Sequence, residues 1–212
     1  MSTTSEIVKR LSQGRTSDQK KVIEYFFGAG GCLKQTLKDE DYQGMVSTVA
    51  SGTDWRKKAL DKVGLDIDQV KEIDPVHFEG YRYDEKTFAR WGKDGVWRSS
   101  AYQISWLFFS STQVYVWQYT FSMVDDTKME RTEEYFYKDV TNFSTVSNTI
   151  EKEVIDKVQC NGVTTYHRKN VDSTEFALVV PGDKFMCSMS QSDKTERVVQ
   201  GMKAKLREKK GA

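Results

Sequence analysis

A chain of 212 residues is long enough to bury a substantial hydrophobic core, and its 38% hydrophobic and 30% charged residues are typical of a globular protein. The 32 Lys and Arg residues nearly equal the 31 Asp and Glu residues, so the sequence lacks the basic excess expected of a nucleic-acid-binding protein. No stretch reaches the roughly 18 consecutive apolar residues that a membrane-spanning helix requires.

The first third of the chain shows the hydrophobic period of about 3.6 that is typical of amphipathic helices. Candidate capping residues precede each apolar stripe, and several stripes end at glycine. We therefore expect residues 1–75 to form a helical segment. The expected helices are Ser5–Leu11, one from Thr16 or Ser17 to Phe27, one around Asp41–Ala50, one from Asp54 to Val63, and a short turn from Asp66 to Ile73.

After Pro75 the hydrophobic period changes to 2, and aromatic and β-branched residues alternate, most clearly from Tyr102 to Phe121. No helical crossover of about ten residues separates the apolar runs, which favours antiparallel strands in a barrel or sandwich. One of the expected strands, Gly95–Phe109, can break near Ala101. The expected strands are His77–Tyr83, Gly95–Phe109, Gln113–Val124, Lys128–Tyr137, Asp139–Val146, Glu151–Cys160, Thr164–Val171, Phe176–Val180 and Lys184–Met189.

Residues with turn-forming side chains stand between these runs and predict where the strands reverse. The expected turns are Asp125–Thr127, Asn161–Gly162, Asp172–Ser173 and Pro181–Asp183. The same alternation predicts which side chains enter the interior. We expect Tyr135 and Tyr137 on the face opposite to Phe136. The residues expected on the interior of the barrel are Trp106, Phe108, Val114 and Val116.

The chain ends in a predicted helix from Asp193 to Glu208, with basic residues toward its C-terminal end. Val198, Val199, Met202 and Leu206 form one apolar stripe along this helix. Because a stripe of this kind is stable only when buried, we expect the helix to be an integral part of the strand-rich core.

Four segments carry a resemblance to a known family. Glu79-Gly80-Tyr81, Trp97-Arg98 and the run from Trp106 to Trp117 look like the first hairpins of a pleckstrin-homology (PH) domain, and Glu134–Val140 resembles a strand pair of bacterial PH-like proteins. About seven strands followed by one amphipathic helix is also the order of such a barrel. The resemblance covers Val76 to Glu208. It implies an α+β fold in which the helical segment 1–75 precedes a PH-like antiparallel β-barrel, 76–212, closed by the C-terminal helix.

The resemblance implies a binding platform for peptides, proteins, lipid head groups or self-assembly, and in the bacterial relatives it implies oligomer formation more than phosphoinositide binding. Fold alone does not assign function. Our first hypothesis is a non-enzymatic binding or scaffolding module that acts through protein–protein contacts or self-association as a homo-oligomer. An exposed strand edge or the groove beside the final helix would bind the partner.

Basic residues in the first strands supply the candidate ligand site. A PH domain holds its head-group-binding cations in this region, and phosphate recognition needs Arg and Lys side chains that converge. Peripheral binding of anionic lipid at a membrane surface is therefore the second hypothesis. Because acidic residues interrupt the run, solvated surface charge is the reading that we favour. The candidate ligand-binding residues are Lys86, Arg90, Lys93 and Arg98.

The sequence carries no recognisable signature of catalysis. Gly28–Gly31 follows a predicted helix and lacks the Lys-Ser/Thr of a phosphate loop. Asp66 and Asp68 lack the Gly and the closing Glu of a calcium loop. His77 and His167 are the only histidines, and there is no Gly-x-Ser-x-Gly motif. We expect no catalytic residue, no metal and no organic cofactor; an enzyme with a scattered site is the third alternative.

The cysteines also favour an intracellular setting. Cys32, Cys160 and Cys187 lie far apart without Cys-x-x-Cys or metal-ligand spacing. An odd count without a disulfide framework is typical of a reducing compartment, in which thiols pack as small hydrophobic side chains. Residues 1–10 lack the apolar run of a secretory signal. We therefore expect a cytoplasmic protein.

Overall fold

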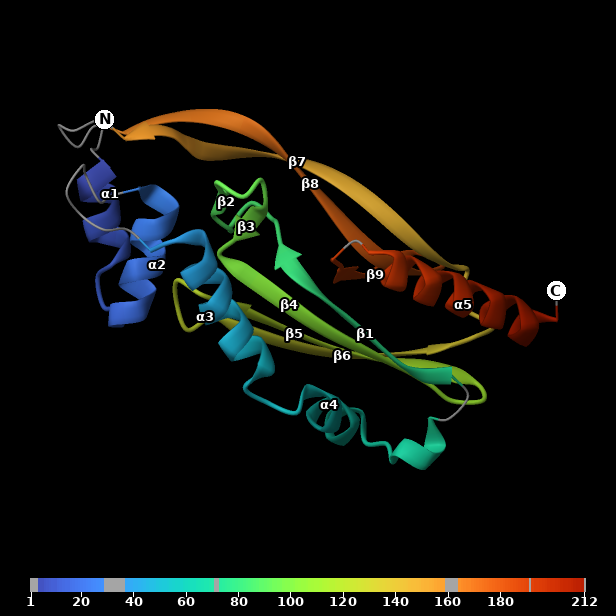
Figure 1. Cartoon of the computed structure of the whole chain (residues 1–212). Coiled ribbons are helices and arrows are strands. Elements are labelled where there is room, and N and C mark those ends of the chain that lie inside the picture. Colours follow the sequence, from blue (N-terminus) through green and yellow to red (C-terminus); the bar gives the residue numbers. More distant parts are fainter. Residues whose placement is uncertain (1–3, 29–36, 71–72, 159–163, 191, 212) are drawn as a thin grey trace.

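The computed structural model describes residues 4–28, 37–70, 73–158, 164–190 and 192–211 (Figure 1). Its five α-helices and antiparallel sheets confirm the predicted α+β class. The strands of these residues form a four-stranded sheet in the order β1-β4-β5-β6, a β2-β3 hairpin and a three-stranded sheet in the order β7-β8-β9. The described strands do not close into a barrel.

Several helix boundaries follow the caps that the sequence predicts, but Ser5 lies inside α1, and Ile73, expected in the short turn, begins a strand. Thr16 and Gln19 form a reciprocal capping box at the start of α2, and Gly28 ends that helix with φ of 61°. Asp54 accepts a hydrogen bond from the Lys57 amide at the start of α4. The helices are α1 (Thr4–Leu11), α2 (Ser17–Phe27), α3 (Asp39–Ser51), α4 (Trp55–Val63), the 3₁₀ turn η1 (Ile67–Gln69) and α5 (Asp193–Lys210).

The strands match the predicted alternation closely up to β6. The predicted strand Gly95–Phe109 divides at Ser100, near the expected break, and the short strand β2 has no counterpart in the prediction. The strands are β1 (Ile73–Arg82), β2 (Ala89–Trp91), β3 (Trp97–Ser99), β4 (Ala101–Phe109), β5 (Gln113–Ser122), β6 (Lys128–Phe136), β7 (Asn142–Val158), β8 (Thr164–Val180) and β9 (Asp183–Ser188).

One predicted turn is wrong. Asp172 and Ser173 lie inside β8, so the four strands expected between Asp139 and Val180 are two strands of 17 residues each. Asp172 pairs with Thr149 of β7, whose hydroxyl donates to the Asp172 carboxylate at 2.6 Å. A cross-strand hydrogen bond thus satisfies the side chain that would otherwise favour a turn. The predicted Asn161–Gly162 turn lies outside the described residues.

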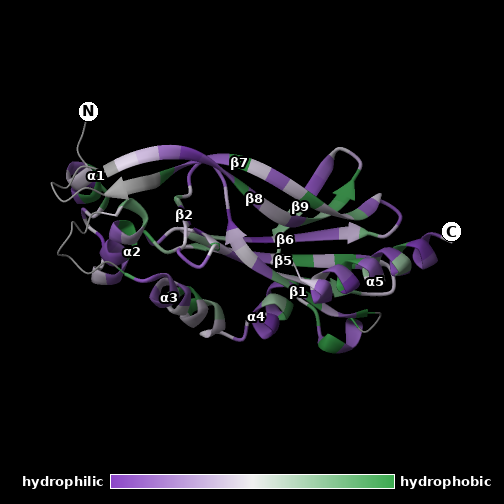
Figure 2. Ribbon diagram, turned by 45° about the horizontal axis from the view of Figure 1, so that its top comes forward, coloured by the Kyte–Doolittle hydropathy of each residue, from purple (hydrophilic) through white to green (hydrophobic). Residues whose placement is uncertain are grey.

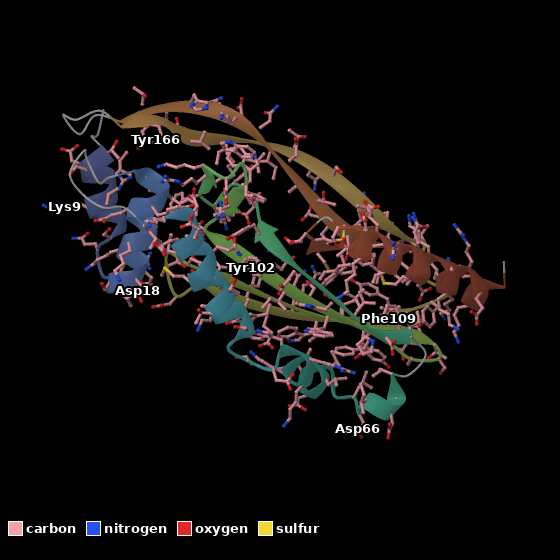
Figure 3. All side chains as sticks on the ribbon, viewed as in Figure 1. Lys9, Asp18, Asp66, Tyr102, Phe109 and Tyr166 are labelled. Carbon is pink, nitrogen blue, oxygen red and sulfur yellow. The ribbon has the colours of Figure 1, made fainter. Side chains whose placement is uncertain are left out.

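Hydrophobic residues cover both faces of the four-stranded sheet. On one face Ile104, Phe108 and Trp117 pack against α2, α3 and α4. On the other face Leu107 and Val116 pack against the β7-β8-β9 sheet and α5. Figure 3 shows side chains crowded on both sides of the strands. The central sheet is therefore the middle layer of the molecule.

This double burial corrects the predicted strand phase. Val116 lies directly opposite Leu107, and Phe108 lies directly opposite Tyr115. Because directly opposed residues share a face, Trp106 and Phe108 point toward the helices, whereas Val114 and Val116 point toward the second sheet. The prediction that all four side chains lie on one interior face is therefore wrong.

Two other packing predictions are confirmed. Tyr137 is buried in the core between the two sheets and the partly buried Tyr135 packs against the same core, while Phe136 is 49% exposed. The apolar stripe of α5 is buried in the same core through Val199, Met202 and Leu206. Figure 2 shows hydrophilic residues alternating with hydrophobic ones along this helix.

The β7–β8 hairpin runs the length of the molecule, from the end that holds α5 to the N-terminal helices (Figure 1). At the far end the Tyr166 hydroxyl lies 3.2 Å from the Thr4 hydroxyl (Figure 3). Midway, the buried Lys152 ammonium donates hydrogen bonds to the carbonyl oxygens of Asp84 and, at 2.7 Å, of Thr87. Lys152 therefore fastens the hairpin to the loop that precedes β2.

Replacing this lysine should weaken the fold measurably. In Lys152→Met the carbonyls of Asp84 and Thr87 lose their donor, and we expect the free energy of unfolding to fall by about 1–3 kcal/mol. Urea denaturation measures the loss. Lys169→Met is the matched control because Lys169 is the exposed cross-strand neighbour of Lys152. Equal stability of the two variants would contradict the role given to Lys152.

Candidate functional site

The structure brings three of the four predicted ligand-binding residues together. Arg90 lies on β2, Arg98 lies on β3, and Lys93 lies in the turn that joins the two strands. The backbone amide of Lys93 donates to Asp39 Oδ2 at 2.8 Å, so the turn rests on the first residue of α3. Lys86 lies apart from this group, exposed at the mouth of a cavity described below.

Both arginines are engaged by carboxylates of the protein. Arg98, only 4% exposed, donates to both carboxylate oxygens of Asp94 at 2.9 and 2.6 Å, and this hydrogen bonding lowers the pKa of Asp94 to about 2. The Arg90 guanidinium lies 4.4 Å from the centre of the Tyr25 ring, donates to the Tyr25 carbonyl and approaches Asp39 at 3.8 Å. These contacts hold the hairpin against α2 and α3. Lipid binding by the predicted residues stays a prediction.

Two buried tyrosines, Tyr25 and Tyr42, and the partly buried Tyr81 complete this polar cluster. Tyr25 donates to Asp39 at 2.8 Å, and Tyr42 donates to the Ser99 carbonyl at 2.6 Å. Tyr81 donates to Gln43 at 2.9 Å. Burial raises the pKa of all three phenols well above the ordinary value. They stay protonated near neutral pH and serve as hydrogen-bond donors in a structural network rather than as acids or bases.

The other residue types that could take part in catalysis or metal binding lie in places that favour a structural role. His77 stacks on Trp106 with 4.7 Å between ring centres, and desolvation lowers its pKa. Burial raises the pKa of the Cys187 thiol to about 12, which keeps it protonated and unreactive. Within the described part of the chain, no three His, Cys, Asp or Glu side chains are placed to hold a metal ion. Cys32 and Cys160 lie outside the described residues.

The outer edge of β6 is an open strand edge. Within the described ranges β6 pairs with β5 alone. The opposite edge of the sheet is partly covered, because the Ser190 amide donates to the Glu79 carbonyl of β1 at 3.0 Å. Met129 and Phe136, near the two ends of β6, are 43% and 49% exposed. Unpaired amides beside exposed apolar side chains are the features of a strand that can accept another strand.

The hydrogen bonds at both ends of the β5–β6 ladder identify which amides of β6 face outward. Ser122 donates to the Thr127 carbonyl, and Tyr137 donates to the Thr112 carbonyl. The register between the two strands is constant, and hydrogen-bonded pairs alternate in an antiparallel ladder. Odd-numbered residues therefore bond to β5, and the backbone groups of the even-numbered residues point away from the sheet. These are Lys128, Glu130, Thr132, Glu134 and Phe136, although the Phe136 carbonyl already accepts hydrogen bonds from the Asp139 and Val140 amides.

Two cavities lie at the end of the molecule that holds α1 and α2. One, of about 610 Å³, is open to the surface and is lined by residues of α1, α2, the 84–88 loop and the ends of β4, β5 and β6. The other, of about 500 Å³, lies between α2, the 84–88 loop and the distal half of the β7–β8 hairpin, and Lys152 lines it. Sequence reasoning did not find either cavity because their walls come from segments far apart in the chain.

Comparison with known proteins does not assign the chain to a family, because no family model, no curated protein and no solved structure matches it. In the residues that the structure describes, no helix combines the length and the apolar character needed to cross a membrane.

Proposed function

We propose that this protein is a non-enzymatic, PH-like scaffolding module that forms a homodimer through the outer edge of β6. The order of elements supports the PH-like part of the proposal. A meander of four strands, β1 and β4–β6, precedes a meander of three strands, β7–β9, and α5 follows. The open edge of β6 carries the proposal of self-association.

The sequence of β6 favours one pairing register. Antiparallel pairing across the free edges must match even-numbered residues of one copy with even-numbered residues of the other. A twofold axis at Thr132 satisfies this condition and overlaps all nine residues of the strand. It also places Arg131 opposite Glu133 of the second copy, twice by symmetry, beside the ion pair that Arg131 Nε already makes with Glu133 Oε1 of its own chain at 2.9 Å.

Other symmetric registers are less favourable. A twofold axis at any of residues 130, 131, 133 and 134 also matches even with even residues, but each shortens the overlap and sets a charged side chain opposite itself. In the Thr132 register the unfavourable pair is Glu130 with Glu134. Glu130 is already stabilised within its own chain, because it accepts a hydrogen bond from Trp117 Nε1 at 2.7 Å and lies 3.6 Å from the Lys62 ammonium. The charges of β6 thus discourage unspecific pairing and select one register.

A proline at the centre of the edge tests this pairing. The Thr132 amide faces away from β5, so Thr132→Pro leaves the β5–β6 ladder intact but removes an outward donor. We expect this variant to be a folded monomer, whereas Thr132→Ala, which keeps the amide, should dimerise like the wild type. Size-exclusion chromatography with light scattering measures the masses, and thermal unfolding checks the fold.

Charge exchange tests the register separately. Arg131→Glu sets two carboxylates opposite each other at each symmetric position and should weaken the dimer at least tenfold. Adding Glu133→Arg restores opposite charges and should recover most of the affinity. If the single and double variants dimerise equally well, Arg131 and Glu133 do not face each other and the proposed register is wrong.

A further inference from the structure

The 610 Å³ cavity has the size and wall chemistry of a small-molecule site. Pockets of about 300–1,000 Å³ with mostly apolar walls and a few polar groups are typical of such sites. Leu11 of α1, Ile23 of α2 and Phe121 of β5 form part of the wall, with Phe88 and Ala101. The polar lining residues come from several segments, among them Arg15 of the α1–α2 loop, the 84–88 loop and the 124–127 turn.

Three carboxylates line the cavity, those of Asp84, Glu85 and Asp125, and the first and last already accept hydrogen bonds. Asp84 accepts hydrogen bonds from Arg82 Nε and from the Lys86 amide, both at 2.9 Å. Asp125 accepts one from the Thr127 amide at 2.9 Å and is thereby held as part of the turn. These groups shape the loops around the cavity.

The guanidinium of Arg15 has fewer partners than these carboxylates. Its Nε is buried and has no hydrogen-bond partner among the described residues. Its Nη2 lies 3.8 Å from Asp125 Oδ2, beyond hydrogen-bond distance. The Arg15 side chain is 36% exposed, and its accessible surface lies outside the buried Nε, so a bound molecule would have to be held by the terminal Nη groups. The lining holds two further cations, Arg82, which is paired with Asp84, and Lys86, which is exposed on the 84–88 loop.

The geometry points to a binding site for an amphiphilic monocarboxylate, with its hydrocarbon part against Ile23, Phe88 and Phe121 and its carboxylate on Arg15. Arginine suits this role because its two terminal Nη–H groups can donate to the two oxygens of a carboxylate. Met129 is the one residue of β6 in the lining, and the inference does not rest on the proposed dimer.

Titration with three ten-carbon probes tests the inference. Isothermal calorimetry on the full chain should show saturable binding of decanoate, at least tenfold tighter than that of decanol, and no tighter binding of decylamine than of decanol. Arg15→Leu should abolish the preference for decanoate and leave the affinity for decanol nearly unchanged. Arg15→Gln should lose the same preference while keeping a polar side chain at the position.

Arg10→Leu is the matched control, because Arg10 is an exposed residue of α1 outside the cavity lining and the variant should bind like the wild type. Ala101→Leu, which fills the cavity, should weaken binding of both decanoate and decanol. Thermal unfolding of each variant separates lost binding from lost folding. Absence of saturable binding by the wild type would overturn the site. An unchanged preference for decanoate in both Arg15 variants would overturn the assignment of the carboxylate to Arg15.

Discussion

Truncation of the chain after Ser190 should yield a protein that no longer unfolds cooperatively. The truncation removes α5, whose Val199, Met202 and Leu206 are only 1%, 1% and 5% exposed in the core between the two sheets. Burying each such side chain stabilises a protein by about 1.5–3 kcal/mol. Their combined loss, on the order of 5–9 kcal/mol, approaches the whole stability of a typical domain.

Near-ultraviolet circular dichroism and urea denaturation measure this effect. We expect the truncated chain to lose its aromatic signal and to bind a hydrophobic dye, because the second sheet loses one covering layer. A chain truncated after Glu208 keeps all three buried residues and should unfold like the full chain. Cooperative unfolding of the shorter chain would show that α5 is an independent arm.

Trp117→Ala should cost about 3–5 kcal/mol of unfolding free energy, the range for removing a large aromatic side chain from a core. Trp117 is fully buried, stacks near Trp55 and Tyr119, and donates to Glu130. The substitution leaves a cavity beneath α4 and removes the donor that orients Glu130.

Trp91→Ala is the matched control, because Trp91 is 46% exposed on β2 and its loss should change stability by less than about 1 kcal/mol. Equilibrium denaturation of the two variants compares them directly. A cost below about 1 kcal/mol for Trp117→Ala would contradict the central place given to this side chain in the core beneath the helices.

Helix limits and most strands could be predicted from the sequence because they depend on local signals. Thr16, Asp54 and Gly64 mark helix ends through hydrogen bonds and backbone angles that involve near neighbours. The phase of β4 and β5 could not be predicted in the same way. Both faces of these strands are buried, so no polar face marks the outside, and the partner layer on each side comes from distant segments.

The long hairpin shows the limit of turn signals. Asp172 and Ser173 have side chains that favour turns, but β7 supplies Thr149 and Asn148 directly opposite them. Once those partners are in place the polar residues continue the ladder. Turn propensity decides where a strand ends only when no facing strand satisfies the same side chains.

The candidate sites depend on tertiary contacts even more strongly. Lys86, Arg90, Lys93 and Arg98 are close in sequence, but the carboxylate beside Arg90 belongs to Asp39, a residue of α3. The β6 strand could be predicted from its alternation, whereas its position at an open edge follows only from the order of strands in the sheet. Arg15 likewise gains its significance from the cavity that distant segments line.

Sedimentation equilibrium of the wild-type chain tests the proposed self-association most directly. An edge of nine residues buries less surface than the roughly 1,200 Å² of a stable interface, so we expect a reversible dimer in the micromolar range. Between about 1 and 500 µM the mean mass should rise from the monomer mass of 24.4 kDa toward twice that value, and Thr132→Pro should abolish the rise. A mass of 24.4 kDa throughout this range, or an equal rise in Thr132→Pro, would contradict dimerisation through β6.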